Sequence, residues 1–270
     1  MVGERTAPAT WADLLALSES LTALGQAAWC EGIESGIATG WPFTDWVEQM
    51  MLGFHGPEVY DQWVNHEIAF DSALVAGVVQ KIIDFFNMPN MMWADGGTIA
   101  TTPFADNGFP LAVGNCAMYR QADFYSAFLP DWVTVGVEVD VFAFPPATAG
   151  TSPQIVSGVW AAPFSDTPGT RAVLEYLGSP EYAETRQIIQ SGLGGPAFFP
   201  ANNGVDVSLW EPWQQAVLEI LHGATVVRPD ASDLMPGAVG ANSFWLYGTQ
   251  MVNGDATVPE GLAAIEASWP

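Results

Sequence analysis

The feature that most constrains the fold of this chain is an alternation of helix-like and strand-like segments along its length. Between Trp11 and Leu21 the apolar residues recur with helical spacing, Thr10 is placed to cap that helix, and Gly25 is placed to end it. The next segments in the first half are a strand at 27–33 and helices at 44–54 and 71–86. This alternation is typical of an α/β protein, in which helices cover a sheet.

The second half continues the pattern with longer irregular stretches. Three segments have the apolar content of strands, at 111–118, 133–144 and 154–164, and the middle one alternates clearly between apolar and polar residues. Clusters of Gly, Pro, Thr, Ser and Asn predict loops at 145–153 and 192–206. Helices are predicted at 167–190, with a break near Pro180, and at 208–222, 240–253 and 258–268.

The charge balance excludes several classes of partner. The chain has 30 acidic and 6 basic residues, which gives a formal net charge of −24. A field of this sign repels phosphate backbones and anionic lipid, so we expect neither nucleic acid nor a membrane surface as partner. The acidic residues are scattered rather than clustered in sequence, which indicates a solvated acidic surface rather than a metal site.

Two further observations concern the membrane. No apolar run approaches the ~20 residues that a helix needs to span a bilayer, so we expect no direct membrane insertion. The first residues, MVGERTAPATW, lack the basic and apolar regions of a secretory signal peptide.

Enzyme signatures are weak, and we expect no catalysis, no cofactor and no metal. His55, His66 and His222 are dispersed and form no zinc-binding motif, and the sequence holds no G-x-S-x-G elbow and no phosphate-binding glycine loop. A glycoside hydrolase remains the enzyme alternative, because such enzymes combine two carboxylates with tryptophans. The pairs would be Glu34 with Asp45, or Asp71 with Asp106.

Tryptophan is abundant, with 12 residues among 270. An indole ring can stack on the apolar face of a sugar, but it also packs well in any core. Each tryptophan taken singly is therefore expected in the core, while the excess as a group favours a carbohydrate site.

Six collinear segments resemble family 1 extracellular solute-binding proteins of carbohydrate ABC transporters, in the subgroup associated with α-glucosides. The segments are PATWADLLALSESLTALG, WCEGIESGIATGWPFTDWVEQMML, GNCAMYRQADF, VDVFAFPP, AAPFSDTPGTRAVLEYLGSPEYAE and NSFWLYGTQMV. The resemblance implies a type II periplasmic-binding-protein clamshell of two α/β lobes, with an oligosaccharide held between them for delivery to the transmembrane permease subunits. It also implies a periplasmic or cell-surface lipoprotein location for the full-length parent.

Aligned with that family, the chain is expected to hold one largely complete lobe and part of the other. Residues 1–157 and 207–270 would form the C-terminal lobe, and residues 158–206 would be a remnant of the N-terminal lobe, most of which would be missing. Apolar surface that the absent part would cover should then be exposed and favour self-association. A truncated remnant that binds no sugar is the alternative to a working receptor.

The resemblance also suggests ligand-binding residues. Trp245 would stack on a sugar ring, and Asn242 would bind hydroxyl groups or instead cap the following helix. On the glycine-rich segment after the first strand, Glu34, Ser35 and Thr39 are candidates for hydroxyl contacts.

Three further ligand candidates and two cysteines complete the predicted set. Trp41, on the same segment, is either a ligand contact or a packing anchor. Arg120 would bind ligand hydroxyls or pair with a neighbouring carboxylate, and Phe124 would face either the ligand or the core. The subgroup also carries cysteines at Cys30 and Cys116, which would form a disulfide in an oxidising compartment and otherwise remain two buried thiols.

Overall fold

The structure is a computed structural model that describes residues 7–94, 97–194 and 197–270. These residues form two compact units. Unit 1 contains the residues up to Gln121, Ala143–Ser157 and Ala224–Pro270, and unit 2 contains Ala122–Phe142 and Gly158–Gly223. Residues 122–142 and 207–223 thus lie with 158–206, whereas the predicted division put them in the other lobe. Which lobe of the family each unit represents stays a prediction.

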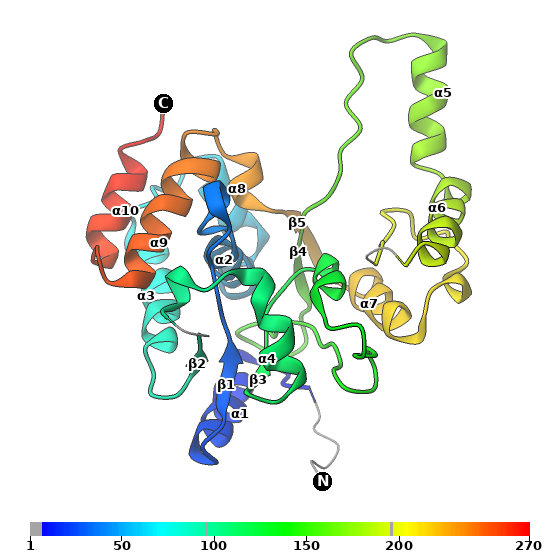
Figure 1. Cartoon of the computed structure of the whole chain (residues 1–270). Helices are drawn as coiled ribbons and strands as arrows, with labels where there is room; N and C mark the ends of the chain where they lie inside the picture. The colour runs from blue at the N-terminus through cyan, green and yellow to red at the C-terminus, as the bar shows by residue number, and fades with distance from the viewer. Residues whose placement is uncertain (1–6, 95–96, 195–196) are drawn as a thin grey trace. The chain divides into compact units, whose positions relative to one another are not determined.

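The elements follow each other in an α/β order (Figure 1). The helices of unit 1 are α1 (Trp11–Ala23), α2 (Trp41–Val64), α3 (Ala73–Phe86), α4 (Gly108–Ala112), α8 (Ala231–Leu234), α9 (Trp245–Asn253) and α10 (Val258–Glu266). Its strands are β1 (Ala27–Cys30), β2 (Met92–Trp93), β3 (Cys116–Met118), β4 (Pro153–Val156) and β5 (Val226–Pro229). The helices of unit 2 are α5 (Pro168–Leu177), α6 (Pro180–Gly192) and α7 (Pro212–His222).

Several shorter helical turns connect these elements. The 3-10 turns are η1 (Gly36–Ala38), η2 (Ile99–Thr101), η3 (Phe104–Asn107), η4 (Asp123–Phe128) and η5 (Val207–Leu209). A π-helix, η6 (Val239–Phe244), runs directly into α9.

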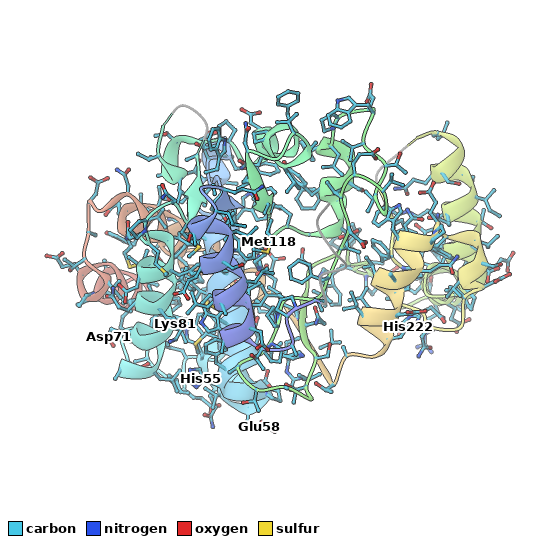
Figure 2. The ribbon with its side chains drawn as sticks, turned by 90° about the horizontal axis from the view of Figure 1, so that it is seen from below. His55, Glu58, Asp71, Lys81, Met118 and His222 are labelled. Carbon is cyan, nitrogen blue, oxygen red and sulfur yellow. A yellow bond between two sulfur atoms is a disulfide. The ribbon has the colours of Figure 1, made fainter. Side chains whose placement is uncertain are left out.

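Unit 1 contains two small parallel sheets. The first has the strand order β2-β1-β3, and the second pairs β4 with β5. In the first sheet, Trp29 of β1 lies opposite Met92 on one side and Met118 on the other. Parallel strands need long crossovers, which α2 and α3 supply between β1 and β2. Met118 lies in the interior, whereas His55 and Glu58 of α2 lie at the surface (Figure 2).

Local signals explain where several helices begin and end. The Thr10 hydroxyl accepts a hydrogen bond from the Asp13 amide at 3.2 Å and so caps α1 as predicted. Gly25 follows this helix with a φ of 81°, which glycine adopts at little cost. The break at Pro180 is also confirmed, because α5 ends at Leu177 and Ser179 caps α6.

Aromatic residues build much of the core of unit 1. Trp29, Trp46 and Trp63 expose 2% or less of their surface. The rings of Trp29 and Trp46 meet edge to face with centroids 5.2 Å apart, and Trp29 Nε1 donates to Ser18 Oγ at 2.9 Å. These three indoles are therefore core residues. Helices α9 and α10 pack beside α3 (Figure 1).

Three strand predictions were wrong in part or entirely. Residues 133–144 form turns with one isolated bridge between Val135 and Val139, and Val137 remains 74% exposed. The alternation is present there, but no neighbouring strand pairs with it along its length. The strand predicted at 111–118 begins only at Cys116, because α4 and a turn at Gly114 occupy its first part. The strand predicted at 154–164 ends at Val156.

A disulfide joins Cys30 of β1 to Cys116 of β3, with the two Cα atoms 5.3 Å apart. It closes a sequence separation of 86 residues that includes α2 and α3. Such a crosslink stabilises the fold mainly because it restricts the unfolded chain.

We expect replacement of both cysteines by serine to lower the free energy of unfolding by about 2–4 kcal/mol. Urea denaturation with and without a thiol reductant measures this difference. The reductant should destabilise the unmodified protein and leave the double variant unchanged, and an unmodified protein insensitive to reductant would contradict the prediction.

Unit 2 leaves much apolar surface exposed. Its buried apolar core is small and contains Ala183, Val205, Trp210 and Leu218. By contrast, α5 has no buried residue, and the extended segment 158–166 is exposed throughout. Val159, Trp160 and Phe164 are 96%, 73% and 103% exposed. Apolar surface of this kind favours association between molecules.

We therefore expect the chain to self-associate as its concentration rises. In sedimentation velocity, the average mass should increase above the 28.9 kDa of one chain. Replacing Trp160 and Phe164 together by serine should reduce the association. A single 28.9 kDa species at every concentration would contradict it.

Candidate functional site

The glycine-rich segment after β1 folds into a tightly hydrogen-bonded turn. The Ser35 amide donates to Thr39 Oγ1 at 3.0 Å, and this hydroxyl donates to the Gly36 carbonyl at 2.7 Å. Glu34 Oε1 accepts from the Gly36 amide at 2.6 Å. Part of the hydrogen-bonding capacity of Glu34 and Thr39 is therefore used within the turn, and both side chains help to hold its shape. Ile37 at its tip is 105% exposed.

Gly40 brings this turn against Trp245, although the two are far apart in sequence. A Cβ atom on Gly40 would lie 2.8 Å from both Cα and the carbonyl carbon of Trp245, so only glycine fits here. Gly40 also has a φ of 111°, which disfavours other residues. The start of α2 and the first turn of α9 are thus in direct backbone contact, which places Gly40, at the end of this turn, against Trp245.

Aromatic side chains flank this contact. Trp41 is half-buried and meets Phe104 edge to face with ring centroids 5.1 Å apart. Trp245 is also half-buried, and its Nε1 has no hydrogen-bond partner among the residues that the structure describes. Because Nε1 is itself buried, it is the exposed part of the indole ring that is suited to contact the apolar face of a sugar.

Asn242 and its neighbour Phe244 differ in exposure: Asn242 lies at the surface and Phe244 in the core. Asn242 lies exposed within the π-helix η6. It does not cap α9, because η6 continues into that helix and leaves no free N-terminus to cap. The capping alternative was therefore wrong, while a ligand role for Asn242 stays a prediction. Phe244 is fully buried against Trp63 and Phe70.

Arg120 is turned toward the interior of unit 1. Its Nη1 donates to Asp45 Oδ2 at 3.2 Å, and only 12% of its side chain is exposed. The guanidinium also lies 5.9 Å from the ring centroids of both Trp46 and Phe144. The structure thus shows the ion-pair alternative for Arg120 formed.

Phe124 belongs to unit 2, whereas the other predicted ligand residues belong to unit 1. It lies in η4, where its ring meets that of Phe128 edge to face at 6.1 Å. Its predicted contact with a ligand remains a prediction.

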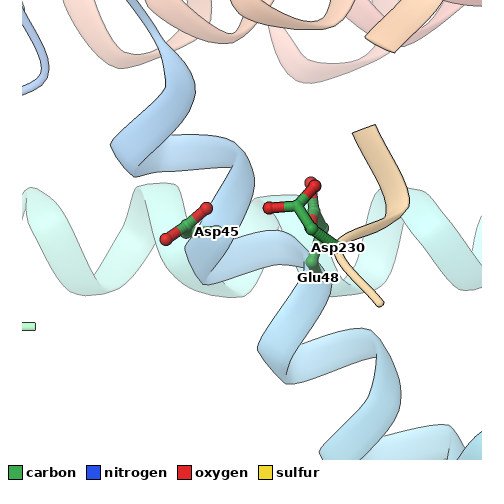
Figure 3. A group of neighbouring side chains, drawn as sticks. All are labelled: Asp45, Glu48 and Asp230. Carbon is green, nitrogen blue, oxygen red and sulfur yellow. The ribbon is translucent and has the colours of Figure 1, made fainter. Parts of the chain in front are cut away.

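A cluster of buried carboxyl groups lies along α2, and sequence analysis missed it. Asp45, Glu48 and Asp230 have carboxylate oxygens within 4.8 Å of one another (Figure 3). Glu48 is fully buried and Asp230 is 9% exposed. The spacing of Asp45 and Glu48 places both on one face of the helix, which was the available signal. Nothing in the sequence indicates that Asp230 joins them.

Glu31 is a fourth buried acid close by. It exposes none of its surface, and its carboxylate accepts from Trp46 Nε1 at 3.0 Å and from the Gly32 amide at 3.2 Å. Burial raises the pKa of Glu31 to about 8. Burial likewise raises the pKa of Asp45 to about 7, against the opposing effect of Arg120, and raises that of Glu48 well above its ordinary value. Glu31 therefore favours its protonated form at neutral pH, where an ordinary carboxyl group is ionised.

We expect the free energy of unfolding to decrease as pH rises from about 5.5 to 8.5. The pKa values of Glu31 and Asp45 are raised to about 8 and 7 in the folded state, from ordinary values of 4.5 and 3.8. Their protonated forms favour folding below the ordinary pKa values. That contribution is lost as pH rises through the raised values.

Replacement of Glu31 by glutamine should make this decrease shallower, by up to about 1.4 kcal/mol per pH unit, because the amide does not titrate. Urea denaturation at several pH values measures the slope. Glu19→Gln, at an exposed position on α1, is the matched control and should leave the slope unchanged. A stability that stays constant or rises over this pH range would contradict the prediction.

Comparison with known proteins places these features in a family. Residues 2–184 match the sequence model of the bacterial extracellular solute-binding proteins. The chain is 38% identical over 267 residues to the osmoprotective compounds-binding protein GgtB of Synechocystis sp., covering 97% of this chain and 62% of that protein. It is 35% identical over 270 residues to the alpha-glucosides-binding periplasmic protein AglE of Rhizobium meliloti, covering 97% and 57%. The chain thus spans less than two thirds of the length of these relatives.

Solved structures show the same fold. A chitin oligosaccharide binding protein superposes with a TM-score of 0.71 at 16% identity, covering 97% of this chain and 64% of that one. The solute receptor AcbH superposes with a TM-score of 0.72 at 15% identity and the same two coverages. The predicted α/β fold of the type II periplasmic-binding-protein kind is confirmed. Among the described residues, no helix is long and apolar enough to cross a membrane.

The family and these relatives are binding proteins rather than enzymes. The resemblance of the six sequence segments is likewise confirmed by the family match and by both relatives. The chain belongs to the bacterial extracellular solute-binding protein family.

Proposed function

We propose that this chain is the substrate-binding component of a carbohydrate ABC importer and that it captures an oligosaccharide of the α-glucoside class. The contact between Gly40 and the backbone of Trp245 carries the proposal, because it joins the end of the glycine-rich turn to a half-buried indole. The relatives support the ligand class, since one is described as binding alpha-glucosides and the other as binding osmoprotective compounds.

Binding uses stacking and hydrogen bonds and involves no bond cleavage. The apolar face of one sugar ring stacks on Trp245, next to the aromatic pair of Trp41 and Phe104. Ring hydroxyls bind to Asn242 and to the polar groups of the turn at Glu34, Ser35 and Thr39. The sugar is then released to the transmembrane permease subunits, which are the protein partner. In the full-length protein this takes place in the periplasm or at the cell surface.

The buried acids do not favour a glycoside hydrolase. A hydrolase needs two carboxyl groups on either side of the scissile bond, about 5–9.5 Å apart and accessible to the sugar. Glu31 and Glu48 expose none of their surface, and Glu48 binds backbone amides of α8.

Isothermal titration with maltose, trehalose, sucrose and a longer α-glucan oligomer tests the proposal. We expect saturable heat with at least one of them and a binding constant weakened about tenfold or more in Trp245→Ala, because the stacking contact is lost. Leu246→Ala is the matched control, since this neighbour is 49% exposed on the same turn of α9, and it should bind like the unmodified protein. Absence of heat with all four sugars would mean that this chain alone is a non-binding part of a receptor.

A further inference from the structure

The short helix α8 is held on α2 by the buried side chain of Glu48. The Glu48 carboxylate accepts hydrogen bonds from the amides of Ala231 at 2.9 Å and Ser232 at 3.3 Å. Asp230 binds the same turn, since its Oδ1 accepts from Ser232 Oγ at 2.8 Å and from the Asp233 amide at 3.2 Å. Two carboxyl groups from different elements thus share one helical turn.

Helix α8 is linked to Trp245 through a close backbone contact with η6. Gly240 of η6 packs on Ser232, where an added Cβ would lie 2.7 Å from the carbonyl carbon and 3.0 Å from Cα. The π-helix η6 continues without a break into α9, whose first residue is Trp245. Trp245 is therefore held from one side by Gly40 at the start of α2, and from the other by η6 resting on α8.

The charges around Glu48 disfavour the simultaneous ionisation of all three carboxyl groups in this cluster. Asp45 and Asp230 face it with their oxygens within 4.8 Å, and Figure 3 shows Glu48 and Asp230 side by side at the surface of α2. The nearby cation is Arg120, which is paired with Asp45. The Tyr60 hydroxyl, on the same helix, donates to the Pro229 carbonyl at 2.8 Å. Three adjacent ionised carboxylates with one cation would repel each other strongly in this buried place.

We propose that Glu48 is a positioning residue for the sugar site: while protonated it lies beside Asp230 without charge repulsion and holds α8, whereas release of its proton sets two carboxylates against each other and loosens α8, η6 and with them Trp245. The inference rests on the function proposed above. It makes sugar binding stronger at low pH than at high pH. The directions of the pKa shifts of Glu48 and Asp45 agree with it, because burial and the neighbouring acids raise both.

Hydrogen–deuterium exchange of the amides at 231–245 tests the first part without any sugar. Between pH about 6 and about 8.5, and after correction for the intrinsic exchange rate, we expect exchange in the unmodified protein to increase about tenfold, as a change of one pKa unit would give. Glu48→Gln should remove most of this increase, because the amide does not titrate and its oxygen can still accept one of the two hydrogen bonds from α8. Asp230→Asn should act in the same direction.

Glu58→Gln is the matched control, because Glu58 lies on the exposed side of the same helix (Figure 2). It should show the pH dependence of the unmodified protein. An unmodified protein whose corrected exchange is independent of pH would overturn the proposal, as would a Glu48→Gln protein that keeps the full dependence.

Titration of the same proteins with maltose and trehalose at both pH values tests the link to the site. We expect the dissociation constant of the unmodified protein to increase about tenfold at the higher pH and that of Glu48→Gln to change little. Binding that is independent of pH, in a protein whose exchange does depend on pH, would overturn the link to Trp245. Absence of binding by every protein at both pH values would instead refute the proposed function, and the exchange measurement would still decide the role of Glu48.

Discussion

The structure of unit 1 depends on how the buried carboxyl groups along α2 are satisfied. Each of these groups binds α2 to a different part of the chain. Glu31, directly after β1, accepts from Trp46 Nε1, and Arg120, which follows β3, pairs with Asp45. Glu48 binds the amides that begin α8. A buried polar group without a partner is costly, so these contacts fix the positions of three segments relative to one helix.

The same contacts explain how an acidic chain keeps a compact core. With a net charge of −24, ionised acids repel each other, and most of them remain in solvent. The few that are buried avoid the cost by keeping a proton or by accepting hydrogen bonds from amide, indole and guanidinium groups. Aromatic rings lie beside this network. The rings of Trp46 and Phe144 lie near the Arg120 guanidinium, and Trp46 Nε1 donates to Glu31. The same aromatic residues therefore pack in the core and form hydrogen bonds with the buried acids, as Trp46 does with Trp29 and Glu31.

Sequence analysis predicted what depends on local spacing. The cap at Thr10, the break before Pro180 and most of the helices follow from the spacing and type of nearby residues. It failed where the outcome depends on distant partners. The alternation at 133–144 is typical of a strand, but a strand forms only where another strand pairs with it.

In the candidate site, too, some residues could be predicted from the sequence and others, which depend on distant contacts, could not. Glu34, Ser35, Thr39, Trp41 and Trp245 were predicted from resemblance, and the structure shows a backbone contact between Gly40 of the same turn and Trp245. Glu48 was missed because the spacing that puts it on one helix face with Asp45 does not show that this face is buried, on a helix whose first part is buried almost all round. Asp230 comes from a segment 182 positions away from Glu48 in the chain, a contact that no local pattern can reveal.

The chemistry that the site presents follows from how its turn is built. Thr39 Oγ1 already accepts one hydrogen bond and donates another, and one oxygen of Glu34 binds the Gly36 amide. The most exposed side chain of the turn is the apolar Ile37. Contact with this surface therefore relies on ring faces and C–H groups more than on the pattern of hydroxyls. An apolar surface discriminates weakly between ligands that differ in a single hydroxyl, whereas a buried polar partner discriminates strongly. Under the function proposed above, fine selectivity among sugars would come from exposed polar groups outside this turn, such as Asn242.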